Sequence, residues 1–152
     1  MPDDVRSPEP PVGLDQFLCF AVYSAGHAFN RIYKPQLDAL RLTYPQFLVM
    51  VCLWAGDGRT VGGLGEALHL ESSTLTPLLK RLEAIGYLTR SRDPADERQV
   101  RIRLTPEGDA LREKAGDLQA CIFAATGLSF EDLRDLQGRI ATLRDNLLKA
   151  AG

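Results

Sequence analysis

The sequence lacks the features that mark several common classes of protein. Its three cysteines are widely spaced and form no Cys-x-x-Cys pair, so neither a disulfide framework nor a zinc knuckle is expected among the 152 residues. No apolar run reaches the ~18 residues of a membrane-spanning helix. The N-terminus has neither the basic nor the apolar region of a secretory signal. We expect a protein of the reducing cytoplasm, with no membrane partner, cofactor or metal.

Excess charge of one sign is also missing from the chain as a whole. Lys and Arg number 18 and Asp and Glu number 20, for a net charge of −2. The distribution is nevertheless uneven, because residues 80–103 contain seven basic and four acidic side chains. Such a cluster is either a solvated face or a surface for nucleic-acid phosphates, and charge alone leaves both open.

The apolar spacing predicts a mainly helical chain with one β-hairpin. In chain order we expect an amphipathic helix at 14–32 with Pro35 just after its end, a helical turn at 36–40, and a buried helix that has its start signal at Thr43-Tyr44-Pro45 and its apolar run at 47–54. A short strand at 59–61, helices at 64–68 and 75–85, a hairpin of strands 87–92 and 100–104, and helices beginning at Thr105-Pro106 and at Ser129 are expected to follow. This order of elements is that of a winged helix-turn-helix protein.

The terminal helices carry more apolar surface than one small domain can cover, which predicts a homodimer. The expected division of the single domain is a flexible tail at 1–13, dimerisation helices at 14–45 and 105–152, and a DNA-binding lobe at 46–104.

The helix after Glu71 has the composition of a DNA-recognition helix. Short hydroxyl side chains near its start can reach base edges or phosphates, and basic side chains two turns later can reach phosphates. Arg90, Arg92 and Arg101 lie in the hairpin strands, where we expect them to contact phosphates. Arg98 at the hairpin tip is the candidate for a narrow minor groove. The predicted DNA contacts are Ser72, Ser73, Thr74, Thr76, Lys80, Arg81, Arg90, Asp96 and Arg98, on double-stranded DNA with a pseudo-palindromic operator.

Two segments resemble a known family. Residues 64–111, LGEALHLESSTLTPLLKRLEAIGYLTRSRDPADERQVRIRLTPEGDAL, resemble the MarR family of bacterial transcription regulators. Residues 18–50, LCFAVYSAGHAFNRIYKPQLDALRLTYPQFLVM, resemble its organic-hydroperoxide-sensing branch, the OhrR-type repressors. The resemblance implies that Asp96 orients Arg98 in the wing.

The same resemblance assigns roles to two of the cysteines. It implies that Cys19 is the peroxide-reactive residue, and that Tyr33 and Tyr44 reach Cys19 from the partner subunit. Tyr23, one helical turn beyond Cys19, is a further phenol that could stabilise its thiolate. Cys121 approximately fits the position of the resolving cysteine in two-cysteine members, although it could also be a core residue. Cys52 lies in an apolar run, where a cysteine behaves as a small hydrophobic residue.

The function expected from the sequence is that of a repressor that releases its operator when an organic hydroperoxide oxidises Cys19. The product would be a sulfenate and then a disulfide, with Cys121 of the partner subunit as the expected second sulfur. A MarR-type regulator that responds to a small aromatic ligand is one alternative. A thiol peroxidase is a second, weakened by the absence of an evident general base among the two histidines, His27 and His69. An interaction-only dimer is a third, against which the basic hairpin argues.

Overall fold

A computed structural model describes residues 13–152, so the expected tail lies almost wholly outside the described residues. The elements are a 3-10 turn η1 (Leu14–Gln16), α1 (Leu18–Ala39), α2 (Tyr44–Ala55), β1 (Arg59–Thr60), α3 (Val61–Leu68), α4 (Ser72–Ile85), β2 (Leu88–Arg92), β3 (Val100–Leu104), α5 (Pro106–Thr126) and α6 (Phe130–Ala150). The strands form an antiparallel sheet in the order β1-β3-β2. The predicted winged helix-turn-helix fold is confirmed.

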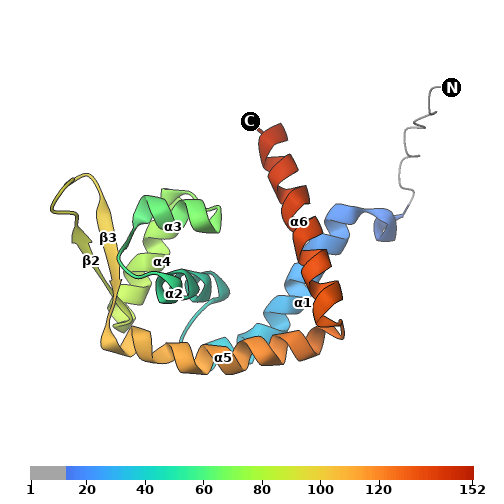
Figure 1. Cartoon of the computed structure of the whole chain (residues 1–152), viewed down its shortest axis with the longest axis horizontal. Coiled ribbons are helices and arrows are strands. Elements are labelled where there is room, and N and C mark those ends of the chain that lie inside the picture. The colour runs from blue at the N-terminus through green and yellow to red at the C-terminus, as the bar shows by residue number, and fades with distance from the viewer. Residues whose placement is uncertain (1–12) are drawn as a thin grey trace.

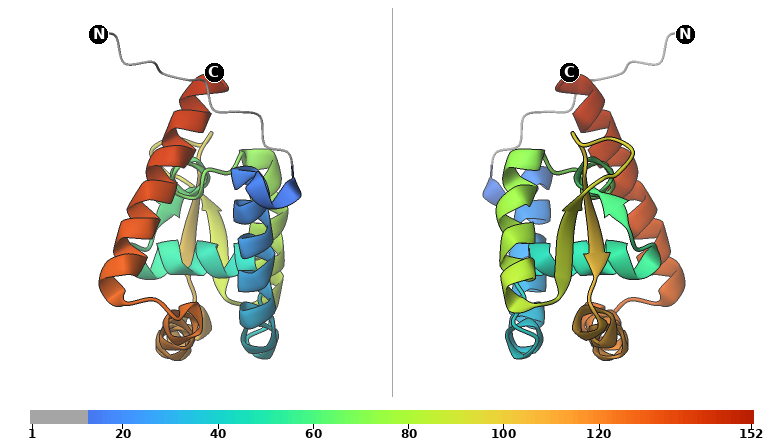
Figure 2. Two further views of the ribbon diagram at one scale, coloured as in Figure 1. Left: turned by 90° about the vertical axis from the view of Figure 1, so that its right-hand side faces the viewer. Right: turned by 90° about the vertical axis from the view of Figure 1, so that its left-hand side faces the viewer.

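The chain has two parts that lie at different ends of α5 (Figure 1). The lobe consists of α2, α3, α4 and the sheet, and α5 runs along its base. α6 and residues 18–32 of α1, which we call the arms, stand at the far end of α5, as Figure 2 shows from two further sides. No residue of either arm is buried, whereas the core lies in the lobe, in the last part of α1 and along α5 as far as Ile122.

Local sequence signals determine where most helices begin. Thr43 caps α2 in a capping box with Gln46, and Pro45 occupies the first turn. The hydroxyls of Thr105 and Ser129 cap α5 and α6, because each accepts a hydrogen bond from a backbone N–H of the first helical turn. These predicted starts are confirmed.

The predicted end of the first helix is wrong. α1 continues through Pro35 to Ala39, although a proline inside a helix costs about 3 kcal/mol relative to alanine. Leu37 and Leu40, just after it, are 2% and 7% exposed. Burying each leucine contributes about 1.5–3 kcal/mol, which is enough to offset the lost hydrogen bond.

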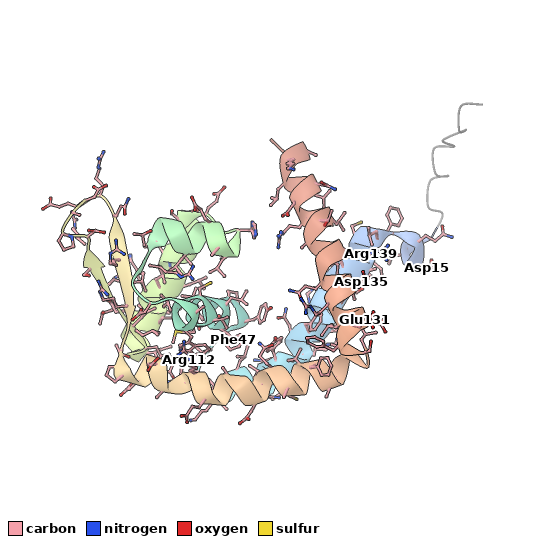
Figure 3. All side chains as sticks on the ribbon, viewed as in Figure 1. Asp15, Phe47, Arg112, Glu131, Asp135 and Arg139 are labelled. Atoms are coloured by element: carbon pink, nitrogen blue, oxygen red, sulfur yellow. The ribbon has the colours of Figure 1, made fainter. Side chains whose placement is uncertain are left out.

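A tight joint fastens the lobe to α1 and α5. Trp54 Nε1 donates to the carbonyl of Gly108 at 2.9 Å, and the Tyr87 hydroxyl donates to the carbonyl of Leu40 at 2.8 Å. A Cβ at Gly108 would lie only 1.9 Å from the carbonyl oxygen of Tyr87, so the close approach requires glycine. Phe47 of α2, labelled in Figure 3, is buried, and its ring centroid lies 5.9 Å from that of Tyr33 in α1.

The arms, by contrast, leave large apolar side chains in solvent. Exposed fractions are 62% for Leu18, 63% for Phe130 and 60% for Leu147. No helix within residues 13–152 combines the length and the apolar character that crossing a membrane requires.

Candidate redox site and nucleic-acid interface

Cys19 lies in the first turn of α1, where its side chain is exposed. The unpaired N–H groups of a first helical turn attract anions. Tyr23, one turn later, is 66% exposed, and its ring packs edge-to-face on His27 with ring centroids 4.5 Å apart.

Tyr33 and Tyr44 lie next to each other at the opposite end of α1. Tyr33 is 6% exposed, and its ring centroid is 4.9 Å from that of Tyr44. At a rise of about 1.5 Å per residue, Tyr33 is ~21 Å along the helix from Cys19. Neither phenol of this pair can therefore reach the Cys19 thiol of its own chain.

Burial keeps these two phenols protonated. It raises the pKa of Tyr33, and the neighbouring Tyr44 raises it further, against a smaller lowering by a hydrogen bond from Gln119. Burial also raises the pKa of Tyr44. Both hydroxyls therefore keep their protons at neutral pH and can donate hydrogen bonds.

A hollow of about 400 Å³ lies beside the tyrosine pair. Phenol, imidazole and amide groups form its polar lining. Gly26 and the phenyl ring of Phe29 form the rest. The lining residues are Tyr23, Gly26, His27, Phe29, Asn30, Tyr33 and Tyr44. A hollow of this size and mixed character can hold a small molecule that has both a polar and an apolar part.

The other two cysteines occupy different surroundings. Cys121 is exposed on α5, where Gln36 Nε2 donates to its sulfur at 3.2 Å. Gln36 is ~25 Å along α1 from Cys19, so Cys19 and Cys121 of one chain are too far apart for a disulfide. Cys52 is half-buried in α2, and burial raises the pKa of its thiol against an opposing effect of Arg59. Cys52 thus has the character of a core residue.

The helix α4 presents the predicted recognition face to solvent. Its opposite side is buried in the core through Leu75, Leu79 and Leu82. Glu71 is the N-cap and makes no capping bond, so no predicted hydroxyl serves as the cap. The exposed residues of α4 include Ser72, Ser73, Thr74, Pro77, Lys80 and Arg81. Thr76 differs from the other predicted contacts, because it is half-buried and its hydroxyl donates to the carbonyl of Ser72 at 2.8 Å.

The tip of the hairpin carries the predicted arginine. The Arg98 side chain is 93% exposed, and its backbone N–H and Nε donate to Asp96 Oδ1 at 3.1 and 3.4 Å. Arg90 is less accessible, because its backbone N–H and its guanidinium both bind Glu83 of α4. These contacts hold the pKa of Glu83 below its usual range and connect α4 to the wing.

The structure contains one ion pair of the wing, Arg101 with Asp93, that the sequence did not predict. Arg101 would join the phosphate-contacting strand residues, but its guanidinium donates to Asp93 and to the carbonyl of Gly58. Its hydrogen bonds lower the pKa of Asp93, which is 7% exposed. Arg101 therefore braces the wing from inside. The sequence signal for this ion pair is an acidic residue, Asp93, directly after β2 and a basic residue, Arg101, in the paired strand β3.

Comparisons with known proteins agree with this geometry. A family model described as "Transcriptional regulator SarA/Rot" matches residues 31–115. The chain is 48% identical over 142 residues to the HTH-type transcriptional regulator TtmR of Methylorubrum extorquens, covering 93% of this chain and 73% of that protein. It is 44% identical over 134 residues to the organic hydroperoxide resistance transcriptional regulator of Bacillus subtilis, covering 88% and 91%. The chain belongs to the MarR and SarA family of transcription regulators.

A solved structure of a similar protein makes this assignment more specific. Reduced AbfR bound to DNA, from Staphylococcus epidermidis, has a TM-score of 0.73 and 32% identity over 86% of this chain and 91% of that one. The same protein has also been solved in an overoxidized form on DNA and in a disulfide form. This MarR-type protein is accordingly a DNA-binding transcriptional repressor of the redox-sensing class, and its predicted likeness to the OhrR-type branch is confirmed.

Proposed function

We propose that this protein is a homodimeric repressor in the cytoplasm that binds its operator while Cys19 is reduced and releases it when an organic hydroperoxide oxidises Cys19. The observation that supports this proposal is that the residues of the proposed redox site lie towards opposite ends of α1. The thiol is exposed at one end, and the protonated phenols of Tyr33 and Tyr44 lie ~21 Å away at the other end. A second copy of the chain is what completes the site.

The position of Gly26 in α1 supports this assembly. In a two-fold dimer, if residue i of one chain contacts residue j of the other, then j also contacts i. Two α1 helices that cross antiparallel at Gly26 bring each Cys19 towards the partner's Tyr33, because Gly26 is midway between them in the sequence. Among residues 13–152, no other element lies within 4 Å of the position that a Cβ would take at Gly26, which leaves room for a partner helix.

The proposed chemistry begins at Cys19. Its thiolate attacks one oxygen of the hydroperoxide, the O–O bond breaks, and the leaving alkoxide takes a proton and departs as an alcohol. The sulfur gains the oxygen as sulfenic acid. The thiolate of Cys121 then attacks the oxidised sulfur, an S–S bond forms, and the oxygen leaves as water. Because the two sulfurs of one chain are far apart, the disulfide joins the two subunits.

The DNA-binding role is assigned to the exposed face of α4 and to the wing. Ser72, Ser73 and Thr74 are proposed to contact base edges and phosphates in the major groove, and Lys80 and Arg81 to contact phosphates. Arg98, oriented by Asp96, enters the minor groove. Thr76 and Arg90 act by shaping α4 and the wing. A dimer presents two such surfaces to half-sites ~34 Å apart.

The decisive experiment measures operator binding in gel shifts on the protein's own promoter, with and without cumene hydroperoxide. Hydroperoxide should release the wild-type protein and the matched control Cys52→Ser, whereas Cys19→Ser should stay bound. Cys121→Ser should form no interchain disulfide on a non-reducing gel. If Cys19→Ser is released as readily as the wild-type protein, hydroperoxide sensing by Cys19 is wrong.

The hollow beside Tyr33 and Tyr44 favours one alternative, a regulator that binds a small aromatic acid. In that case the acid would release Cys19→Ser from the operator, and hydroperoxide would release neither protein. The same gel shifts, repeated with benzoate or salicylate in place of the hydroperoxide, distinguish the two functions.

We further propose that the oxidation is stoichiometric and that the protein is no peroxidase. His27 packs on Tyr23, and His69 lies exposed at the end of α3, so neither is placed to act as a base for Cys19 in one chain. Without an added thiol reductant, about one hydroperoxide should be consumed per subunit, and a reductant should restore Cys19 too slowly for catalytic turnover. Sustained turnover would support the enzyme instead.

A further inference from the structure

The helix α4 contains a proline where helices usually exclude one. Pro77 lies in the interior of Ser72–Ile85, well past the first turn, and its ring is exposed. Proline is the least favourable residue in a helix interior, because it removes a backbone hydrogen bond and its ring crowds the carbonyl four residues earlier. Leu75, Leu79 and Leu82, on the buried side, hold α4 in place despite this.

The carbonyl of Ser73 is consequently left without its usual donor. It would accept the N–H of residue 77, and proline has none. The preceding carbonyl, that of Ser72, is in contrast contacted by the Thr76 hydroxyl at 2.8 Å. Because Ser73 is exposed and carbonyls on the solvent side of a helix tilt outward, we expect its oxygen to accept from an external donor.

The acceptor and the proline ring lie together on one exposed face. Residues four apart share a face of a helix, and Ser73 and Pro77 are both exposed. Lys80 and Arg81 continue the exposed surface one turn further along α4. The face thus combines a hydrogen-bond acceptor, a rigid apolar ring and two cations within two turns.

An A·T base pair in the major groove has the complementary groups. Adenine presents the N6 amino donor, and its thymine presents the C5 methyl group. We infer that the Ser73 carbonyl and the Pro77 ring together read one A·T pair in each half-site, the carbonyl accepting from adenine N6 and the ring packing on the thymine methyl. A G·C pair places the acceptor O6 of guanine against the carbonyl and has no methyl group. This inference rests on the proposed insertion of α4 into the major groove.

The test works without a known operator sequence. The reduced protein is used to select a duplex from a randomised pool, and single bases of that duplex are then replaced. Thymine replaced by uracil loses the methyl group, and adenine replaced by purine loses the N6 amino group. For the wild-type protein, one A·T pair in each half-site should respond to both replacements, with a loss of affinity of up to about tenfold.

Pro77→Ala restores the N–H donor to Ser73 and removes the ring. This variant should bind the selected duplex about tenfold more weakly, keep its affinity for non-specific DNA, and lose its response to both replacements at that pair. Pro35→Ala is the matched control, because it makes the same change inside α1 and should keep the wild-type response. Both variants should unfold at the wild-type temperature or above, which excludes unfolding as the cause.

Each outcome decides something different. If Pro77→Ala responds to every replacement as the wild-type protein does, the reading of an A·T pair by Pro77 is wrong, and the proposed function is unaffected. If the reduced protein enriches no duplex at all, the proposed operator binding fails, and the role of Pro77 fails with it.

Discussion

The lobe and the arms use apolar residues in opposite ways. In the lobe, Leu64, Leu75 and Ile102 are completely buried, whereas in the arms Phe130 and Leu147 keep about three-fifths of their surface exposed. The lobe is therefore complete as a single chain, and the arms are not. The candidate redox cysteine lies in the incomplete part, where a second chain supplies the remaining contacts in the proposed dimer. In that dimer, a covalent change at Cys19 would alter the spacing of the two lobes without unfolding either of them.

Charged groups show the same contrast. In the lobe, Glu83 binds Arg90, and Asp93 binds Arg101, and both acids have lowered pKa values because of these contacts. In the arms, the polar side chains Glu131, Asp135 and Arg139 follow successive turns of α6 (Figure 3). The pair of Arg144 with Asp145 is exposed on both sides, where an ion pair contributes little.

The largest expected effect comes from the arms. Ile140→Arg combined with Leu147→Arg places two charges on the apolar side of α6 and should prevent dimerisation. The operator affinity should then fall by about 100-fold or more, because a single lobe binds only one half-site. Sedimentation gives the oligomeric state, and gel shifts give the affinity.

Thr142→Arg combined with Asp145→Arg adds two arginines to the opposite side of α6 and serves as the control. It should remain dimeric. A dimeric Ile140→Arg, Leu147→Arg protein would show that the arms do not form the interface.

The contact between the lobe and α5 should be nearly as sensitive to substitution. Gly108→Ala forces a Cβ against the carbonyl of Tyr87 and should lower the free energy of unfolding by about 3 kcal/mol. Gly116→Ala, on the same helix with open space around it, should leave stability unchanged or raise it by up to ~1 kcal/mol. Urea unfolding at one fixed protein concentration compares the two. Equal stabilities would mean that α5 shifts away from the lobe at little cost.

A smaller effect is expected at Tyr87. Tyr87→Phe removes the hydrogen bond to Leu40 and should cost about 1 kcal/mol in the free energy of unfolding. Because this bond connects the end of α1 to the wing, the ratio of reduced to oxidised operator affinity should also fall. Thermal unfolding and paired gel shifts measure the two effects. If Tyr87→Phe lowers stability but leaves the ratio of reduced to oxidised operator affinity unchanged, this hydrogen bond does not connect α1 functionally to the wing.

The smallest effect concerns acid pH. The folded-state pKa of Asp93 is lowered by Arg101, so its contribution to stability is present above the unfolded pKa of about 3.9 and is lost as the pH falls through the lower folded value. Asp93→Asn should reduce stability at pH 7 and flatten its decline below pH ~4. Melting temperatures between pH 7 and pH 3 provide the measurement. An unchanged slope would assign the acid sensitivity to other carboxylates.

Much of the fold could be predicted because its signals are local. Thr43-Tyr44-Pro45, Thr105-Pro106 and Ser129 each place a cap beside the first helical residues, so a few neighbouring side chains determine the start of a helix. The alternation of β2 and β3 also needs only adjacent residues. The likeness of residues 18–50 and 64–111 to one family identified Cys19 and the recognition helix for the same reason, since their motifs are continuous in sequence.

The sequence by itself determined the order of elements, the helix starts and the types of residue at the candidate site. Only the tertiary structure decided that α1 continues through Pro35 and that Arg101 turns inward, to Asp93 and to the carbonyl of Gly58. Each of these depends on contacts between distant segments, whose burial and hydrogen bonds outweigh the local preference of a single residue.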